Sequence, residues 1–150
     1  MADLTLAEAQ GLIQVLKRIL QEGKLALPKS GSIAKFELCS VFSEKDRFTV
    51  IANRSSKIRK DKYTLMLRYG KDKGLLRIDV GGPDHVNPDG TIVTCPHLHI
   101  QKKDSGAWDA WAAEIPAVFG NVEDRIETFR TFLQYCNVNN IASIEITEME

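Results

Sequence analysis

The sequence has few cysteines and no long hydrophobic run, and these two absences exclude several classes of protein. Its three cysteines, Cys39, Cys95 and Cys136, are an odd number without a CxxC pair. They predict free thiols in a reducing compartment rather than a disulfide framework or a zinc knuckle. No apolar stretch approaches the roughly 18 residues of a membrane-spanning helix, and the first residues lack the basic start and hydrophobic region of a secretion signal. We therefore expect a cytoplasmic protein without a membrane partner.

A net charge is also absent, but the charges are unevenly distributed. The chain has 20 Lys and Arg against 20 Asp and Glu. Residues 54–103 hold eleven basic and five acidic side chains, whereas residues 104–150 hold two basic and nine acidic ones. The apolar fraction of 43% is typical of a globular protein, and the length suits one domain over residues 1–150. We expect a single domain with a basic middle and an acidic C-terminal third.

The spacing of the apolar residues predicts an α+β fold. A capping box formed by Thr5 and Glu8 begins a predicted helix over about residues 5–22. Period-two alternation then predicts strands over about residues 33–42, 47–54, 62–69, 75–80 and 92–101. Short connections between successive strands indicate an antiparallel meander of about five strands. A second helix is predicted over about 122–136, with Asn121 as its cap, and a last strand over 141–146.

All three histidines of the chain, His85, His97 and His99, fall within fifteen residues. In an extended strand alternate side chains share a face, so we expect Cys95, His97 and His99 to point the same way. The preceding loop over residues 81–91 is rich in glycine and proline, which predicts a rigid turn. This turn is expected to bring His85 to the other two histidines.

Three chemical roles fit this histidine cluster. Paired imidazoles can act as general base and acid, for example in the attack of an RNA 2′-hydroxyl on its own phosphate. Three imidazoles can instead hold zinc or another divalent metal with an open position for water, and Asp84 or Asp89 is then an additional ligand or orients a ring. In the third role the rings are structural and donate their protons to loop carbonyls. The residues alone leave all three roles open.

The basic middle supplies candidate substrate-binding residues. Lys57 and Arg59 lie in its densest positive run, and Arg68 and Arg77 flank a predicted hairpin turn. A surface of this kind attracts phosphate groups, although a solvated turn accounts for the charges equally well. Trp108 and Trp111 are predicted to be anchors of the core.

Two resemblances bear on this segment. Residues 76–90 and 96–100 resemble the GPPH-x-NPDG and PHLHIY signature of a small bacterial and phage family without an established function; Asp84 stands in place of the second proline and Gln101 in place of the tyrosine. The resemblance covers about residues 62–141. A shorter resemblance is to histidine-rich toxins of toxin–antitoxin pairs with a DNAPHH and PHHxH arrangement after a hairpin. It implies that the three histidines lie together beside Arg68 or Arg77.

The leading functional hypothesis is an RNA-directed, histidine-dependent nuclease of a mobile element or a toxin–antitoxin locus. In it His97 and His99 share proton transfer and His85 completes the site, while four basic residues bind the substrate: Arg68, Arg77, Lys57 and Arg59. The partners are then RNA and an antitoxin. The alternative is a non-enzymatic phage or prophage protein that binds and inhibits a host defence complex, as anti-CRISPR proteins do. A third hypothesis is a metal-dependent hydrolase with zinc at the three histidines.

Overall fold

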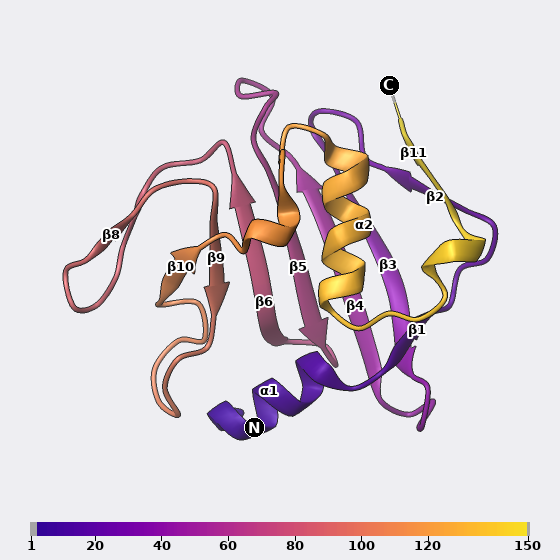
Figure 1. The fold of residues 1–150 in the computed structure, drawn as a ribbon, viewed down its shortest axis with the longest axis horizontal. Helices are drawn as coiled ribbons and strands as arrows, with labels where there is room; N and C mark the ends of the chain where they lie inside the picture. Colours follow the sequence, from indigo (N-terminus) through magenta and orange to yellow (C-terminus); the bar gives the residue numbers. More distant parts are fainter. Residues whose placement is uncertain (1–2, 150) are drawn as a thin grey trace.

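The period-two segments pair into one antiparallel sheet in the computed structural model, which describes residues 3–149 (Figure 1). Within this range the sheet has seven strands in the order β1-β3-β4-β5-β6-β9-β10. Their bounds are β1 Lys17–Ile19, β3 Ser32–Ser40, β4 Arg47–Arg54, β5 Tyr63–Tyr69, β6 Lys73–Val80, β9 His97–Ile100 and β10 Ala112–Glu114. A parallel pair joins β2 (Lys24–Leu27) to β11 (Glu145–Glu148), and β7 (His85–Val86) pairs with β8 (Ile92–Val93). The predicted α+β meander is confirmed, but five strands was too few.

Two of the missed strands, β1 and β10, are short segments at the two edges of the seven-stranded sheet. β1 and β10 each contain three residues, which is too few for a period-two pattern to be recognised. The predicted strand over residues 92–101 is also divided, because Pro96 has no backbone N–H to donate to a ladder. Cys95 therefore lies outside β9, and the expectation that it shares a strand face with the histidines was wrong. Its thiol lies 3.2 Å from the carbonyl oxygen of Asp79.

The first helix begins as predicted but ends early. α1 (Leu6–Gln14) is capped by the reciprocal hydrogen bonds between Thr5 and Glu8. The prediction of helix as far as residue 22 was wrong, because residues 17–19 pair with β3 instead. Lys17 contributes to this ending. Its side chain is fully buried, and its ammonium donates hydrogen bonds to the carbonyls of Ile13, Val15 and Cys136 at 2.7, 2.9 and 2.8 Å.

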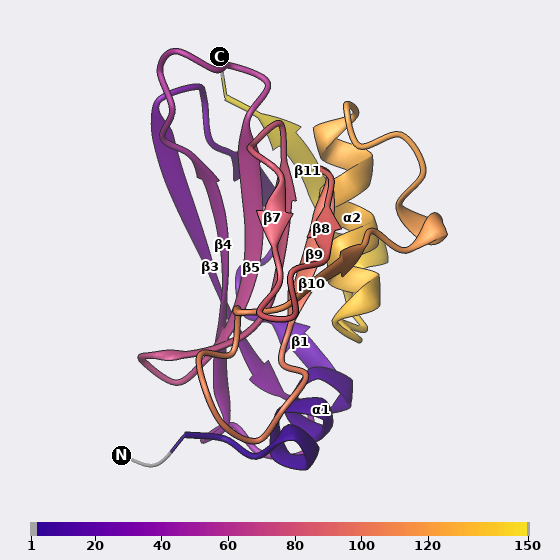
Figure 2. The same cartoon turned by 90° about the vertical axis from the view of Figure 1, so that its left-hand side faces the viewer.

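The second helix, α2 (Arg125–Tyr135), lies across one face of the sheet, and no helix formed by residues 3–149 covers the other face (Figure 2). Its N-cap is Asp124 rather than Asn121, and its fully buried side chains include Phe129, Phe132 and Leu133. The Phe129 ring packs against Phe36 of β3 at 5.3 Å between centroids. The last strand begins at Glu145, later than predicted, because residues 141–143 form a 3-10 turn. The hydrophobic core therefore lies between α2 and the sheet.

The two tryptophans differ from the sequence prediction, whereas the three cysteines agree with it. Trp108 and Trp111 are only half-buried, so the prediction that they anchor the core was wrong. All three cysteines are free thiols, as predicted. No helix within residues 3–149 has the length and apolar character needed to cross a membrane.

At each edge of the seven-stranded sheet, the side chain of an asparagine forms hydrogen bonds with the outward-facing backbone N–H and C=O of one residue. At β10 the backbone N–H of Ala112 donates to Asn87 Oδ1 at 2.8 Å, and Asn87 Nδ2 donates to the Ala112 carbonyl at 3.1 Å. At β1 Asn140 makes the same two bonds to Ile19, at 2.9 and 3.0 Å. Both carboxamides thus act as one-residue extensions of the sheet.

Candidate metal centre

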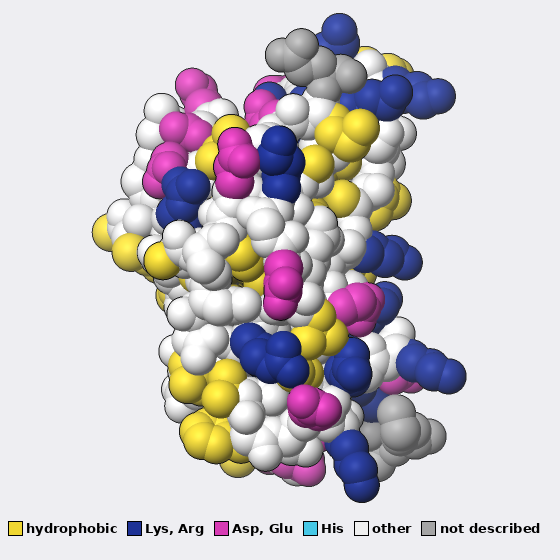
Figure 3. Space-filling model, turned by 90° about the vertical axis from the view of Figure 1, so that its right-hand side faces the viewer, with side chains coloured by type: hydrophobic (Ala, Val, Ile, Leu, Met, Phe, Trp, Pro, Cys, Tyr) yellow, Lys and Arg dark blue, Asp and Glu magenta, His cyan; other side chains and the backbone are white. Residues whose placement is uncertain are grey.

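Four polar side chains from β6 and β9 meet on the sheet face that carries no helix. The two strands are antiparallel neighbours, and their register pairs Arg77 with His99 and Asp79 with His97. Because side chains alternate across a strand, all four residues point to this face. The alternating residues Ile78 and Leu98 face the core on the other side. The end of the molecule near β2 and β11, away from β6 and β9, has interspersed acidic and basic side chains on its surface and shows no histidine (Figure 3).

The ligand atoms of Asp79, His97 and His99 converge. Their candidate atoms all lie within 4.8 Å of one another. His97 Nε2 is 3.4 Å and His99 Nε2 is 3.2 Å from Asp79 Oδ2. A tetrahedral centre with bonds of about 2.0–2.1 Å separates its ligand atoms by about 3.3 Å. The spacing therefore fits a small divalent cation such as zinc.

The orientation of each ring is fixed by a backbone carbonyl. His97 Nδ1 lies 3.3 Å from the Thr94 oxygen, and His99 Nδ1 lies 2.8 Å from the Asp109 oxygen. A carbonyl oxygen only accepts, so Nδ1 carries the hydrogen in both rings and Nε2 of the neutral ring is an acceptor. Two imidazole lone pairs and one carboxylate oxygen thus face a common point. Histidines that bind metals have this arrangement, with the second ring nitrogen donating to a carbonyl or carboxylate.

The segment over residues 109–112 holds much of this arrangement in place. Besides accepting from His99, it accepts a hydrogen bond from His85 Nε2 at the Ala110 oxygen, at 2.8 Å. The Asp109 carboxylate accepts from Arg77 Nη1 at 3.2 Å. Asn87 fixes the end of the segment through its two bonds to Ala112. One short segment therefore orients two of the three histidines.

His85 lies beside the ligand group rather than within it. Its ring centroid is 4.7 Å from that of His99 and 6.0 Å from that of His97. Because Nε2 donates to a carbonyl, Nδ1 is the acceptor nitrogen of the neutral ring. The structure thus brings all three predicted histidines together, but the group with metal-ligand spacing contains His97, His99 and Asp79.

Arg77 fixes the carboxylate of Asp79. Its Nε donates to Oδ1 at 2.7 Å and its Nη2 to Oδ2 at 3.2 Å. Burial alone would raise the pKa of Asp79, but the two hydrogen bonds and the positive charge of the Arg77 guanidinium hold that pKa well below its usual range. The carboxylate is therefore ionised at neutral pH and available to a cation.

The depressed pKa of Asp79 predicts an acid-sensitive contribution to stability. In the unfolded chain this carboxyl titrates near its ordinary pKa of about 3.9. Its contribution is therefore complete above that pH and is lost as the pH falls toward the lower folded-state pKa. We expect the difference in urea-unfolding free energy between the wild type and Asp79→Asn to stay constant from pH 6 to about pH 4.5 and then to shrink as the pH falls to about 2.5. A constant difference over this range contradicts the assignment.

The histidines and Asp79 lie in a cavity of about 680 Å³ on the sheet face. The cavity is lined by Ile51, Asn53, Lys62, Thr64, Met66, Arg77, Asp79, Val80, Gly82, Pro83, Asp84, His85, His97, His99 and Asp109. Both ligand rings are only 2% exposed, so they form part of the cavity floor. An incoming molecule would have to enter the cavity to reach them.

The predicted substrate-binding residues are only partly brought to this cavity. Arg77 lies in it, but its guanidinium is engaged by Asp79 and Asp109. Arg68, Lys57 and Arg59 do not line it. Their proposed role in binding a substrate stays a prediction.

The sequence interpretation missed the two carboxylates of the site, Asp79 and Asp109. Of the aspartates it considered, Asp84 lines the cavity and accepts from the Cys95 N–H at 3.4 Å, while Asp89 accepts hydrogen bonds from Thr91 in an exposed turn. Neither belongs to the group with metal-ligand spacing. Asp79 did carry a signal, since it is a charged residue between apolar neighbours in a predicted strand.

Residues 4–138 match the model of a protein family described as a family of unknown function, DUF6978. The chain belongs to this family. No curated protein and no solved structure matches it significantly. Membership of an uncharacterised family is thus confirmed, whereas the resemblance to toxins stays a prediction.

Proposed function

We propose that this DUF6978 protein is a hydrolase whose active site is a single divalent transition metal of the zinc class, held by Asp79, His97 and His99. The observation that carries the proposal is the convergence of three acceptor atoms, with both Nε2 atoms 3.2–3.4 Å from Asp79 Oδ2. Two histidines, one carboxylate and an open position form a known type of catalytic zinc site. The open position would face the cavity.

The same geometry favours a metal over proton transfer by His97 and His99 alone. In each of these rings one nitrogen faces a backbone carbonyl and the other faces Asp79. Neither ring therefore presents an unengaged nitrogen to a substrate, as a general base must. The Nε2 lone pairs of His97 and His99 repel the Asp79 carboxylate that they face. A cation bound among these three acceptors would remove the repulsion without adding a proton to either ring.

His85 has a separate role in this proposal. A bound metal would supply a water whose pKa is lowered toward about 7. His85 lines the same cavity, is held by the Ala110 carbonyl and keeps Nδ1 as an acceptor. We assign it the transfer of a proton to or from the reacting groups.

The proposal is tested by metal binding and hydrolysis together. Protein freed of metal with a chelator is titrated with zinc, cobalt or manganese, and hydrolysis of chromogenic carboxylic and phosphate esters is followed. We expect about one tightly bound metal per chain and activity only in the loaded protein. Asp79→Asn should weaken binding more than tenfold, and Asp72→Asn, which removes an exposed carboxylate, should not. Equal binding by both variants, or no binding by the wild type, contradicts the proposal.

The same proteins test the metal-free nuclease and the inhibitor of a defence complex. RNA cleavage that persists in chelator and is lost in His97→Ala and His99→Ala would favour the nuclease. A stable complex with a defence protein that survives both substitutions would favour the inhibitor.

A further inference from the structure

We infer, on the basis of the proposed hydrolase, that the substrate is a single-stranded nucleic acid. One of its phosphodiesters reaches the metal ligands, and a neighbouring phosphate is bound in a groove beside Lys62. The groove belongs to the loop over residues 55–62, which connects β4 to β5.

A second cavity extends the metal cavity toward this loop. It has a volume of about 420 Å³ and is lined by Asn53, Ser55, Ser56, Lys62, Tyr63 and Thr64. Three of these residues, Asn53, Lys62 and Thr64, also line the cavity that holds the histidines. The two cavities are therefore adjacent, and together they offer a track for an extended substrate. A track that extends past the reacting position suits a polymeric substrate better than a small molecule.

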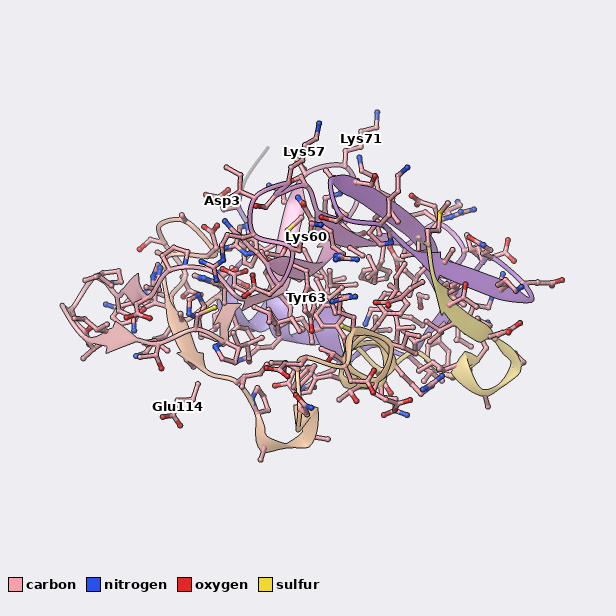
Figure 4. All side chains as sticks on the ribbon, turned by 90° about the horizontal axis from the view of Figure 1, so that it is seen from above. Asp3, Lys57, Lys60, Tyr63, Lys71 and Glu114 are labelled. Atoms are coloured by element: carbon pink, nitrogen blue, oxygen red, sulfur yellow. The ribbon has the colours of Figure 1, made fainter. Side chains whose placement is uncertain are left out.

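Lys62 provides a positive charge where the two cavities meet. Within residues 3–149 no carboxylate lies within ion-pair distance of its ammonium, whereas Arg59 of the same loop is paired with Asp61 at 3.1 Å. Lys57 and Lys60 are exposed on the loop above the sheet, where Lys57 points away from the molecule (Figure 4). Hydroxyl and amide groups line the rest of the second cavity. This combination is suited to the phosphate of a nucleic acid backbone.

Gly81 allows the loop to lie against the histidine segment, and Gly82 lies beside Lys62. Gly81 has a φ of +75°, and a Cβ at this position would lie 2.9 Å from the Asp61 carbonyl oxygen. A Cβ on Gly82 would lie 3.7 Å from Lys62 Cε. A side chain at residue 81 would force the two segments apart. Gly81 therefore allows the loop to place Lys62 beside the metal cavity.

The position of the ligands on the cavity floor favours a single strand over a duplex. A duplex has a stiff backbone and keeps its bases stacked and paired, whereas a single strand can bend into a concave site and turn its bases toward the wall. The side chains of Ile51 and Met66 form an apolar part of the cavity wall. An unstacked base can pack against such a surface, which a paired base cannot reach.

The test compares two lysine substitutions in metal-free protein, where the proposed metal-dependent cleavage cannot occur. Binding of a fluorescein-labelled ten-nucleotide RNA is measured by anisotropy for the wild type, Lys62→Gln and Lys71→Gln. Lys71 is exposed in the β5–β6 turn, at the opposite end of β5, so its substitution removes the same charge elsewhere. We expect Lys62→Gln to weaken binding about fivefold to tenfold and to reduce the salt dependence of log K by about 0.7. Lys71→Gln should change binding less than twofold.

Equal losses in the two variants, absence of RNA binding, or equally tight binding of a duplex of the same sequence would each overturn the inference. A DNA strand that binds as well as RNA supports it and shows that the 2′-hydroxyl is not recognised, whereas weaker DNA binding supports it and assigns RNA. Because binding is measured without metal, these outcomes do not depend on whether the proposed hydrolase is correct. Metal titration of the same Lys62→Gln protein should be unchanged.

Discussion

His99→Ala is expected to lose the bound metal and all metal-dependent hydrolysis, whereas His85→Ala should keep the metal and react more slowly. His99 Nε2 lies 3.2 Å from Asp79 Oδ2 and its ring is oriented by the Asp109 carbonyl, so its loss removes one of three ligands. His85 lies next to this group and acts in proton transfer. Removing a general acid or base lowers kcat by about 10²–10⁴-fold without affecting metal affinity. Metal titration and steady-state kinetics on both variants separate the two roles.

Folding must be checked in the same experiment, because the His99 ring is almost fully buried. Circular dichroism and urea unfolding of the metal-free proteins show whether His99→Ala keeps its fold. His99→Gln offers a second variant that fills more of the space and still lacks the imidazole. If His85→Ala loses the metal and His99→Ala retains it, our assignment of ligand and proton-transfer group is wrong.

Lys17→Met is expected to destabilise the protein by about 1–3 kcal/mol, which is the usual cost of leaving buried hydrogen-bonding groups without their partner. The ammonium of Lys17 donates to three carbonyls that end α1 and α2, those of Ile13, Val15 and Cys136. Burial lowers its pKa to about 8, so it is still mostly protonated at neutral pH. Methionine has a similar length but no donor, and it would leave two buried carbonyls and one partly buried carbonyl without this partner.

Chemical unfolding of Lys17→Met at pH 7 measures this effect. The matched control is Lys35→Met, which introduces the same side chain at an exposed position of β3 and should change stability by less than about 0.5 kcal/mol. Equal stability of the two variants would show that the Lys17 network does not hold the helix ends. Lys17→Arg is a useful intermediate, since it keeps the charge but has to fit a larger group into a closed space.

The features that the sequence predicted correctly are those encoded in local spacing. The capping box at Thr5 and Glu8, the alternation in β3 to β6 and the apolar stripe of α2 each depend on a few neighbouring residues. The clustering of the histidines followed from the same kind of reasoning, because Gly and Pro fix the turn before them.

The errors arose where a distant segment decides the structure. Asp79 becomes part of the site only through its register with His97 on β9, and no local pattern specifies that register. α1 ends at Gln14 because residues 17–19 bond to β3, although the apolar spacing continues as in a helix. Lys62, rather than Lys57 or Arg59, lines the cavity because of the close approach between its loop and Gly81. Charge density along the chain cannot reveal such an approach.

The asparagines at the two ends of the sheet have a consequence for solubility. An edge strand with unpaired backbone groups can bond to a strand of another molecule and start aggregation. Here Asn87 and Asn140 occupy the outward N–H and C=O groups of Ala112 and Ile19, which an incoming strand would need. The sheet is thus closed to growth by intermolecular pairing at these points. Because Asn87 also fixes the segment that orients His85 and His99, protection against self-association and the geometry of the candidate site depend on the same side chain.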